Sequence, residues 1–306
     1  MSRPPASSAV APGAGSGSPF RRIQSALYRR QPLQVLLLLA PPVGWFGVVY
    51  LGSLAVLLVS AFWYLDPATS AIRHDFSLQN FQLLLSDRVY LTVALRTVTI
   101  AAAVTVIDIV LAFPIAYYMA RVASPRIRAA LFMAILLPLW AGYLVKVYAW
   151  RVILAQGGPL DWFLRQVGLP DASPGYSDLS MVIVFCYLWL PYMITPIYAG
   201  LERIPGSLLE ASADLGGRSG TTFRRVILPL VMPALAAGSI FTFSLTLGDY
   251  ITPKLVSNSQ FIGNVVFDSQ GVSNNVPFAA AFALVPIAIM GVYLLGARRL
   301  GAFEAL

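Results

Sequence analysis

The sequence predicts an all-α, polytopic membrane protein with six transmembrane helices. Hydrophobic residues make up 58% of the 306 residues and charged residues only 11%, whereas in a soluble domain roughly a quarter of the residues are charged. The apolar residues gather in runs close to the length of about 20 residues that a spanning helix needs. One compact bundle accounts for this length and leaves little room for a second, soluble domain.

Six apolar runs define the expected spans, and they set the domain boundaries. The spans cover residues 43–64, 96–119, 129–149, 181–200, 230–249 and 277–297. The transmembrane domain therefore extends over residues 31–300. Residues 1–30 are expected to form a disordered basic tail, because the segment is rich in Ser, Ala, Pro and Gly. Residues 301–306 form a short C-terminal tail.

The positions of Lys and Arg predict how the chain is oriented in the membrane. If the N-terminus lies inside, most of the 21 Lys and Arg residues fall in the inner connections, as the positive-inside rule requires. The net charge of +8 then lies beside the anionic lipids of the cytoplasmic leaflet, and no nucleic-acid partner is needed to explain it. Both termini are thus expected in the cytoplasm.

The connection between the fourth and fifth expected spans is polar and predicts a short helix. Ser207 and Glu210 have the spacing of a capping box, which marks a helix start. Gly216 and the glycine after it mark the C-cap of this helix. Asp214 and Arg218 are spaced to pair across that end.

The same helix is unusually poor in side-chain bulk. Ala211, Ser212 and Ala213 follow one another in its middle, and small residues allow another backbone to approach closely. A second short helix is expected to begin with Ser219 as its cap. We therefore expect the loop over residues 201–229 to project into the cytoplasm, where a partner receives it.

A few polar residues in or near the spans are candidates for a substrate pathway. Asp108 lies midway along the second span, where a carboxylate is costly unless it is paired, hydrated or protonated. It is either a structural hydrogen-bond partner or a pathway residue that contacts a cationic substrate. Asp249, near the outer end of the fifth span, is either a solvated acid at a helix end or part of a gate. Tyr143 and Tyr192 complete the candidates.

The residues that would support catalysis in this chain are missing from the sequence. It contains no GxxxxGK[ST] loop for nucleotide phosphates. One histidine and one cysteine are too few for a metal site built from nitrogen and sulfur ligands. We therefore expect no catalytic residue, no metal and no cofactor on this chain. If ATP drives transport, another polypeptide must hydrolyse it.

The polar connection resembles the EAA loop of binding-protein-dependent ABC importer permeases. The matching positions are Glu210-Ala211-Ser212, Gly216, Val226 and Leu228-Pro229. The likeness extends over most of residues 30–300, where LPLWAGYLVKVYAW, LPYMITPIYAGLERIP and LGDYITPKLV resemble the spermidine/putrescine branch. Lys254 stands where that branch is expected to carry an acid, which argues against a polyamine substrate.

The resemblance implies a type I ABC importer (MetI-like) permease fold in a bacterial inner (plasma) membrane. In that family the loop forms a coupling helix that docks in a cleft of the ATP-hydrolysing subunit. The coupling residues would be Ser207, Glu210, Ala211, Ser212, Asp214, Gly216 and Arg218. The implied partners are two ATP-binding cassette ATPase subunits that hold ATP and magnesium, a second and related permease subunit, an extracytoplasmic solute-binding protein and membrane lipid.

The predicted function is translocation of a small solute, with a polyamine such as spermidine or putrescine as the best single candidate. The alternative is a secondary transporter driven by an ion gradient, in which Asp108 would be the proton or cation site. No inverted internal repeat is evident in the sequence. An EAA-type loop would also serve no purpose in such a transporter.

Overall fold

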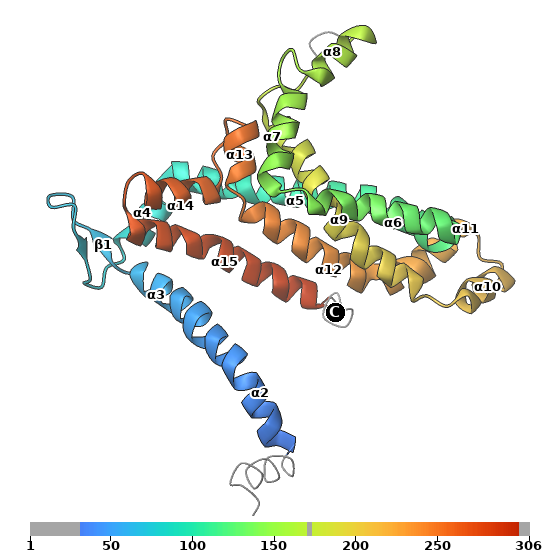
Figure 1. Ribbon diagram of the computed structural model, residues 1–306, viewed down its shortest axis with the longest axis horizontal. Helices are drawn as coiled ribbons and strands as arrows, with labels where there is room; N and C mark the ends of the chain where they lie inside the picture. Colours follow the sequence, from blue (N-terminus) through green and yellow to red (C-terminus); the bar gives the residue numbers. More distant parts are fainter. Residues whose placement is uncertain (1–30, 170–172, 300–306) are drawn as a thin grey trace, which may run out of the picture. The chain divides into compact units, whose positions relative to one another are not determined.

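The computed structural model describes residues 31–169 and 173–299, which are mostly helical (Figure 1). The expected tails at residues 1–30 and 301–306 lie outside the described residues. The chain divides into two units, Met1–Leu57 and Leu58–Leu306, and each is described by itself.

The first unit holds most of one helix of membrane length, which continues to Ser60. It is built from α2 (Gln31–Trp45), the π-helical segment η1 (Phe46–Leu51) and most of α3 (Gly52–Ser60). The apolar part of this helix, Leu38–Ser60, has 23 residues. The first span was predicted too late in the sequence. Pro41 and Pro42 do not end the helix, because neighbouring backbone groups of a membrane helix can adjust around a proline.

The second unit begins with small elements at one end of its helices. β1 (Tyr64–Leu65) pairs antiparallel with β2 (Ile72–Arg73), with Tyr64 opposite Arg73. Helix α4 (Gln79–Ser86) follows. Asn80 holds it to the preceding turn, because its side-chain amide donates to the carbonyl oxygen of Trp63 at 2.8 Å.

Four long helices form the body of the second unit. They are α5 (Arg88–Tyr117), α9 (Asp178–Glu202), α12 (Leu228–Leu247) and α15 (Val276–Arg299). The π-helical segment η2 (Tyr118–Val122) extends α5, while α11 (Ser219–Thr222) and η3 (Phe223–Ile227) lead into α12. The extended helices Arg88–Val122 and Ser219–Leu247 have 35 and 29 residues.

Helices α5, α9 and α12 pack against one another through small residues. A Cβ atom on Gly200 would lie 2.6 Å from the Cβ of Ala234, and one on Gly238 would lie 2.8 Å from the sulfur of Met193. The glycines therefore allow the backbones of α9 and α12 to approach closely, as is common between membrane helices. Ala112 and Ala116 of α5 are fully buried in the same cluster.

The third predicted span, residues 129–149, is not one straight helix. α6 (Pro125–Trp140) ends at Ala141, and α7 (Tyr143–Leu154) starts a new direction after Gly142. The segments on the two sides of this break are bent by 97°. The described residues thus contain five helices long and apolar enough to span a membrane, or up to six if the bent pair counts as one span.

The short helices α8 (Pro159–Gln166), α13 (Ile251–Val256) and α14 (Ile262–Gly271) lie away from α10 (Gly206–Asp214), which is at the opposite end of α9 and α12 (Figure 1). The expected coupling loop is therefore separated from the candidate gate residues by the length of the helices.

Candidate functional site

Helix α10 begins close to the predicted position but without the predicted capping box. Its N-cap is Pro205, whose extended backbone (φ −63°, ψ 138°) leads into Gly206, and no side chain caps it. Ser207 therefore lies within the first turn of the helix. Its hydroxyl cannot act as the N-cap acceptor from that position, so the capping-box prediction was wrong.

The predicted C-cap is confirmed and has the geometry of a Schellman motif. Gly216 has a φ of +74°, and its N–H donates to the carbonyl of Ala213 at 2.8 Å. The N–H of Gly217 donates to the carbonyl of Ser212, also at 2.8 Å. Among the described ion pairs there is none between Asp214 and Arg218.

A side-chain hydrogen bond fastens α10 to the helix that follows. The hydroxyls of Ser212 and Thr222 lie 2.8 Å apart, and both residues are half-buried. A Cβ atom on Gly217 would lie 2.6 Å from the carbonyl oxygen and from the hydroxyl of Ser212. The helix α11 begins at Ser219 itself, with Arg218 as its N-cap. The loop is therefore a compact helical hairpin seated on the start of α12.

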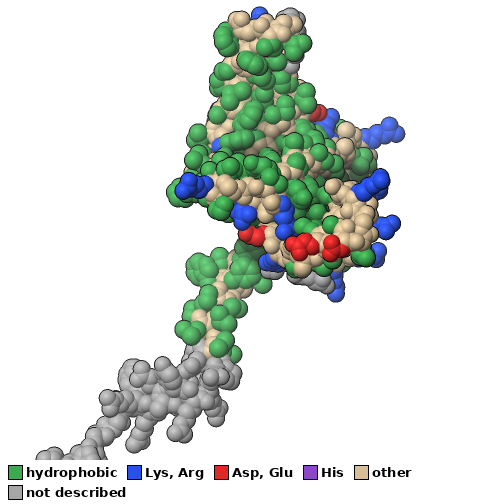
Figure 2. All heavy atoms as spheres, turned by 90° about the vertical axis from the view of Figure 1, so that its right-hand side faces the viewer, with side chains coloured by type: hydrophobic (Ala, Val, Ile, Leu, Met, Phe, Trp, Pro, Cys, Tyr) green, Lys and Arg blue, Asp and Glu red, His purple; other side chains and the backbone are tan. Residues whose placement is uncertain are grey.

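The outer surface of this hairpin is apolar at its tip and basic along its side. Leu215 is 89% exposed and Leu208 is 43% exposed. Arg218, Arg224 and Arg225 line an open groove of about 700 Å³. Figure 2 views this end of the second unit, where Lys and Arg side chains are spread around the face and a short row of acidic side chains crosses it.

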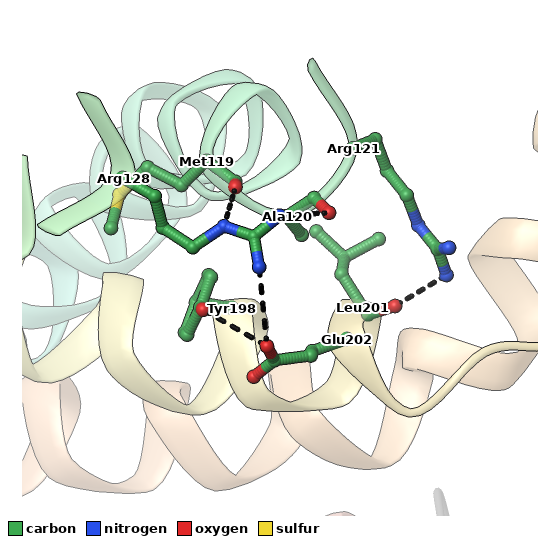
Figure 3. Close-up of polar contacts among 7 residues, drawn as sticks. All are labelled: Met119, Ala120, Arg121, Arg128, Tyr198, Leu201 and Glu202. Atoms are coloured by element: carbon green, nitrogen blue, oxygen red, sulfur yellow. Dashed lines mark hydrogen bonds and ion pairs between the residues drawn. The ribbon is translucent and has the colours of Figure 1, made fainter. Parts of the chain in front are cut away.

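Two arginines connect the base of the hairpin to the neighbouring helices (Figure 3). Arg121 of η2 donates to the carbonyl oxygens of Leu201 and Ile204, at 2.5 and 2.7 Å. Arg128 of α6 donates from Nε to the carbonyl oxygen of Met119 at 3.0 Å. The sequence analysis missed both residues, because their acceptors are backbone oxygens that carry no sequence signal.

Asp108 lies inside the packed core of the second unit. It is fully buried, and neither of its carboxylate oxygens has a hydrogen-bond partner among the described residues. The hydroxyl of Thr242 and the indole N–H of Trp189 are also buried without a partner there. Asp108 is close to the thiol of Cys186 on α9.

Tyr143 and Asp249 are brought together at the other end of the bundle. The hydroxyl of Tyr143 donates to the carboxylate of Asp249. The same carboxylate accepts from the backbone N–H of Ile251 at 2.8 Å and from the hydroxyl of Thr252 at 2.9 Å. Asp249 is only 8% exposed, so it is neither solvated nor free of partners.

Tyr192 and Lys254 occupy two further places. Tyr192 is 38% exposed and lines an open groove of about 420 Å³ between α6, α9 and α12, together with Thr195 and Phe241. Lys254 pairs with Asp268 at 3.2 Å. The four pathway candidates thus fall into three separate places, with only Tyr143 and Asp249 in contact.

Comparison with known proteins gives a consistent result over most of the chain. Residues 101–301 match the family described as "Binding-protein-dependent transport system inner membrane component". The chain is 46% identical to the "Inner membrane ABC transporter permease protein YdcU" of Escherichia coli (strain K12), over 96% of each chain. It is 31% identical to the "Spermidine/putrescine transport system permease protein PotB" of the same strain, over 83% of this chain and 92% of PotB.

Solved structures with a similar fold include a bacterial ABC transporter for import of the acidic polysaccharide alginate. One alginate transporter structure, in complex with an alginate pentasaccharide-bound periplasmic protein, aligns with a TM-score of 0.69 at 16% identity. The alignment covers 93% of this chain and 98% of the other. At this level of identity the likeness shows the fold of the chain rather than its substrate.

Proposed function

Because the chain belongs to the family of binding-protein-dependent transport system inner membrane components, we propose that α10 couples ATP hydrolysis on a partner to the passage of a small solute. The chain is an ABC importer permease subunit of the inner membrane, and such subunits have no ATPase site of their own. Membership in this family argues against the alternative hypothesis that the chain is a secondary transporter driven by an ion gradient.

The observation that carries the coupling role is the shape of α10. The helix is short, is followed by a glycine with positive φ, and exposes the small residues Ala211 and Ala213 beside the acidic Glu210 and Asp214. Small side chains on a helix allow the backbone of another protein to approach it closely. We assign the docking surface to the predicted coupling residues, Ser207, Glu210, Ala211, Ser212, Asp214, Gly216 and Arg218, and add the exposed tip, Leu215.

The assembly that this role requires has four further subunits. Two ATPase subunits would bind ATP and magnesium and grip α10 and its counterpart on a second, related permease. An extracytoplasmic solute-binding protein would deliver solute at the end of the bundle that carries α13 and α14. This arrangement places α10 and both termini in the cytoplasm. Closure of the ATPase pair drives transport only if it favours one arrangement of the helices over another.

The proposed solute is a polyamine. The name of the relative PotB supports this class, and the mostly apolar groove between α6, α9 and α12 suits the alkyl part of such a molecule. Tyr192 lies in this groove, where we propose that it contacts the solute. Asp108 is buried elsewhere in the bundle and does not line this groove. The Tyr143–Asp249 contact would close the outer end.

Uptake by whole cells tests the function directly. Cells with the complete importer are compared with cells that lack only this chain, using radiolabelled putrescine and spermidine. Uptake that requires both this chain and ATP supports the proposal. If neither polyamine is taken up while other, unlabelled solutes stimulate the ATPase of the importer, the polyamine assignment is rejected and the permease role stands. If uptake persists without the chain, the role in this importer is rejected as well.

A further inference from the structure

The junction beneath α10 holds the ends of α5, α6 and α9 together through backbone carbonyls. Arg121 is half-buried in η2, and its two acceptors belong to Leu201 and Ile204, which are buried at the end of α9. The last carbonyls of a helix have no partner within the helix. The guanidinium of Arg121 donates to the carbonyl of Leu201 in the last turn of α9, which also accepts from the N–H of Ile204 at 3.3 Å, and to the carbonyl of Ile204 just beyond the helix. Hydrogen bonds from a charged donor are stronger than neutral ones.

The acceptors of Arg121 lie immediately before the hairpin. Ile204 precedes Pro205, the N-cap of α10, and proline fixes its own φ. The connection from Ile204 into α10 therefore has little freedom to absorb a movement of the hairpin. A displacement of α10 moves the carbonyl of Ile204, and the hydrogen bond transfers that movement to Arg121 and to the helix that carries it.

The helix that carries Arg121 reaches from this junction to the other end of the bundle. Arg88–Val122 is continuous over 35 residues. In the third turn from its far end, the hydroxyl of Thr97 accepts a hydrogen bond from the N–H of Ile262 in α14, at 3.2 Å. The chain therefore contains a connected path from α10 through Arg121 and α5 to the opposite end.

Arg128 supports the same junction from α6, by a different and weaker route. Its Nε donates to the carbonyl of Met119, and its guanidinium lies 3.6 Å from the carboxylate of Glu202 (Figure 3). The side chain of Glu202 is 52% exposed. An exposed ion pair of this kind contributes little, whereas the acceptors of Arg121 are buried.

We propose that Arg121 is a positioning residue that makes α5 follow the movement of α10 and so couples ATP hydrolysis to transport. The inference rests on the coupling role proposed for α10. The competing explanation is that the side-chain packing between α5 and α9 carries the movement without the arginine. The two differ in what happens when the guanidinium alone is removed.

The experiment uses the complete importer in nanodiscs and in proteoliposomes, with Arg121→Gln, Arg121→Lys and the control Arg126→Gln. Arg126 lies in the first turn of α6, is exposed, and makes no hydrogen bond or ion pair among the described residues. For Arg121→Gln we expect normal capture of the ATPase and a transport yield per ATP lowered about tenfold, within the range of allosteric couplings. Arg121→Lys should recover part of the yield, and Arg126→Gln should match the wild type.

Two results would overturn the inference. A wild-type transport yield per ATP in Arg121→Gln would show that packing carries the movement. Loss of ATPase capture together with transport in Arg121→Gln would show that the arginine only holds the hairpin in place. Neither result resembles failure of the proposed function, in which the wild-type chain itself would capture no ATPase.

Discussion

The hydroxyl of Tyr143 donates a hydrogen bond to the carboxylate of Asp249 and thereby joins the start of α7 to the end of α12. The N–H of Ile251 and the hydroxyl of Thr252 share that acceptor. Asp249 therefore organises the turn into α13, in addition to any contact with solute. The bent pair α6–α7 is held against the bundle at this point.

Asp249→Asn should destabilise this end of the bundle. An amide replaces one acceptor oxygen by a donor, which leaves buried N–H or O–H groups facing it, at a cost of about 1–3 kcal/mol. We expect a lower melting temperature of the purified chain in detergent. Tyr143→Phe removes one donor only and serves as the milder comparison. Equal stability of Asp249→Asn and the wild type would contradict the hydrogen-bond network described for this turn.

Gly217→Ala should disturb the hairpin, whereas Gly220→Ala should not. A Cβ on Gly217 would lie 2.6 Å from the backbone oxygen of Ser212, while one on Gly220 meets nothing within 4 Å. We expect Gly217→Ala to expose the loop over residues 201–229 to limited proteolysis and to reduce capture of the ATPase. Similar behaviour of the two variants would argue against the tight seating of α10 on α11.

Two single-cysteine variants test the orientation of the chain. Ser207 of α10 and Ser273, after α14, are both exposed, and the native Cys186 is buried. In a Cys186→Ala background, we expect Ser207→Cys to react with an impermeant maleimide only in inverted vesicles, and Ser273→Cys only in intact cells. Labelling of Ser207→Cys in intact cells would place α10 outside and reject the coupling role.

Asp108→Leu should stabilise the purified chain. An unpaired buried polar group costs about 1–3 kcal/mol, and an apolar group of similar shape removes that cost. We expect a higher melting temperature in detergent than that of the wild type. A markedly lower melting temperature than that of the wild type would show that the carboxyl group makes a stabilising contact with α5, α9 or α12. Polyamine uptake by the same variant then distinguishes a structural role from a pathway role.

The sequence patterns located the long helices and the hairpin, because both leave local signals. Long apolar runs predict spans, and the glycine pair after Asp214 predicts the C-cap with its positive φ. The break at Ala141–Gly142 was not predicted, because the apolar composition continues across it. Tertiary contacts decide such a break, and the Tyr143–Asp249 bond joins residues far apart in the sequence.

The junction of Arg121 and Arg128 shows the limit of motif-based prediction at the site. The acceptors of Arg121 are backbone oxygens 80 and 83 positions away, so no pair of residue types identifies them. The available signal was indirect. Two arginines flank Pro125, at the point where one long helix ends and the next begins, and helix ends leave carbonyls that need donors.

Capture of the ATPase by two leucine variants tests the coupling role of α10 most directly. Leu215 lies at the tip of the hairpin and is 89% exposed, and Leu85 of α4, at the other end of the bundle, is 73% exposed. Neither substitution by Glu removes a buried contact. We predict that Leu215→Glu is inserted normally but no longer co-purifies with the ATPase, while Leu85→Glu co-purifies like the wild type. Undiminished capture by Leu215→Glu would contradict the docking of α10.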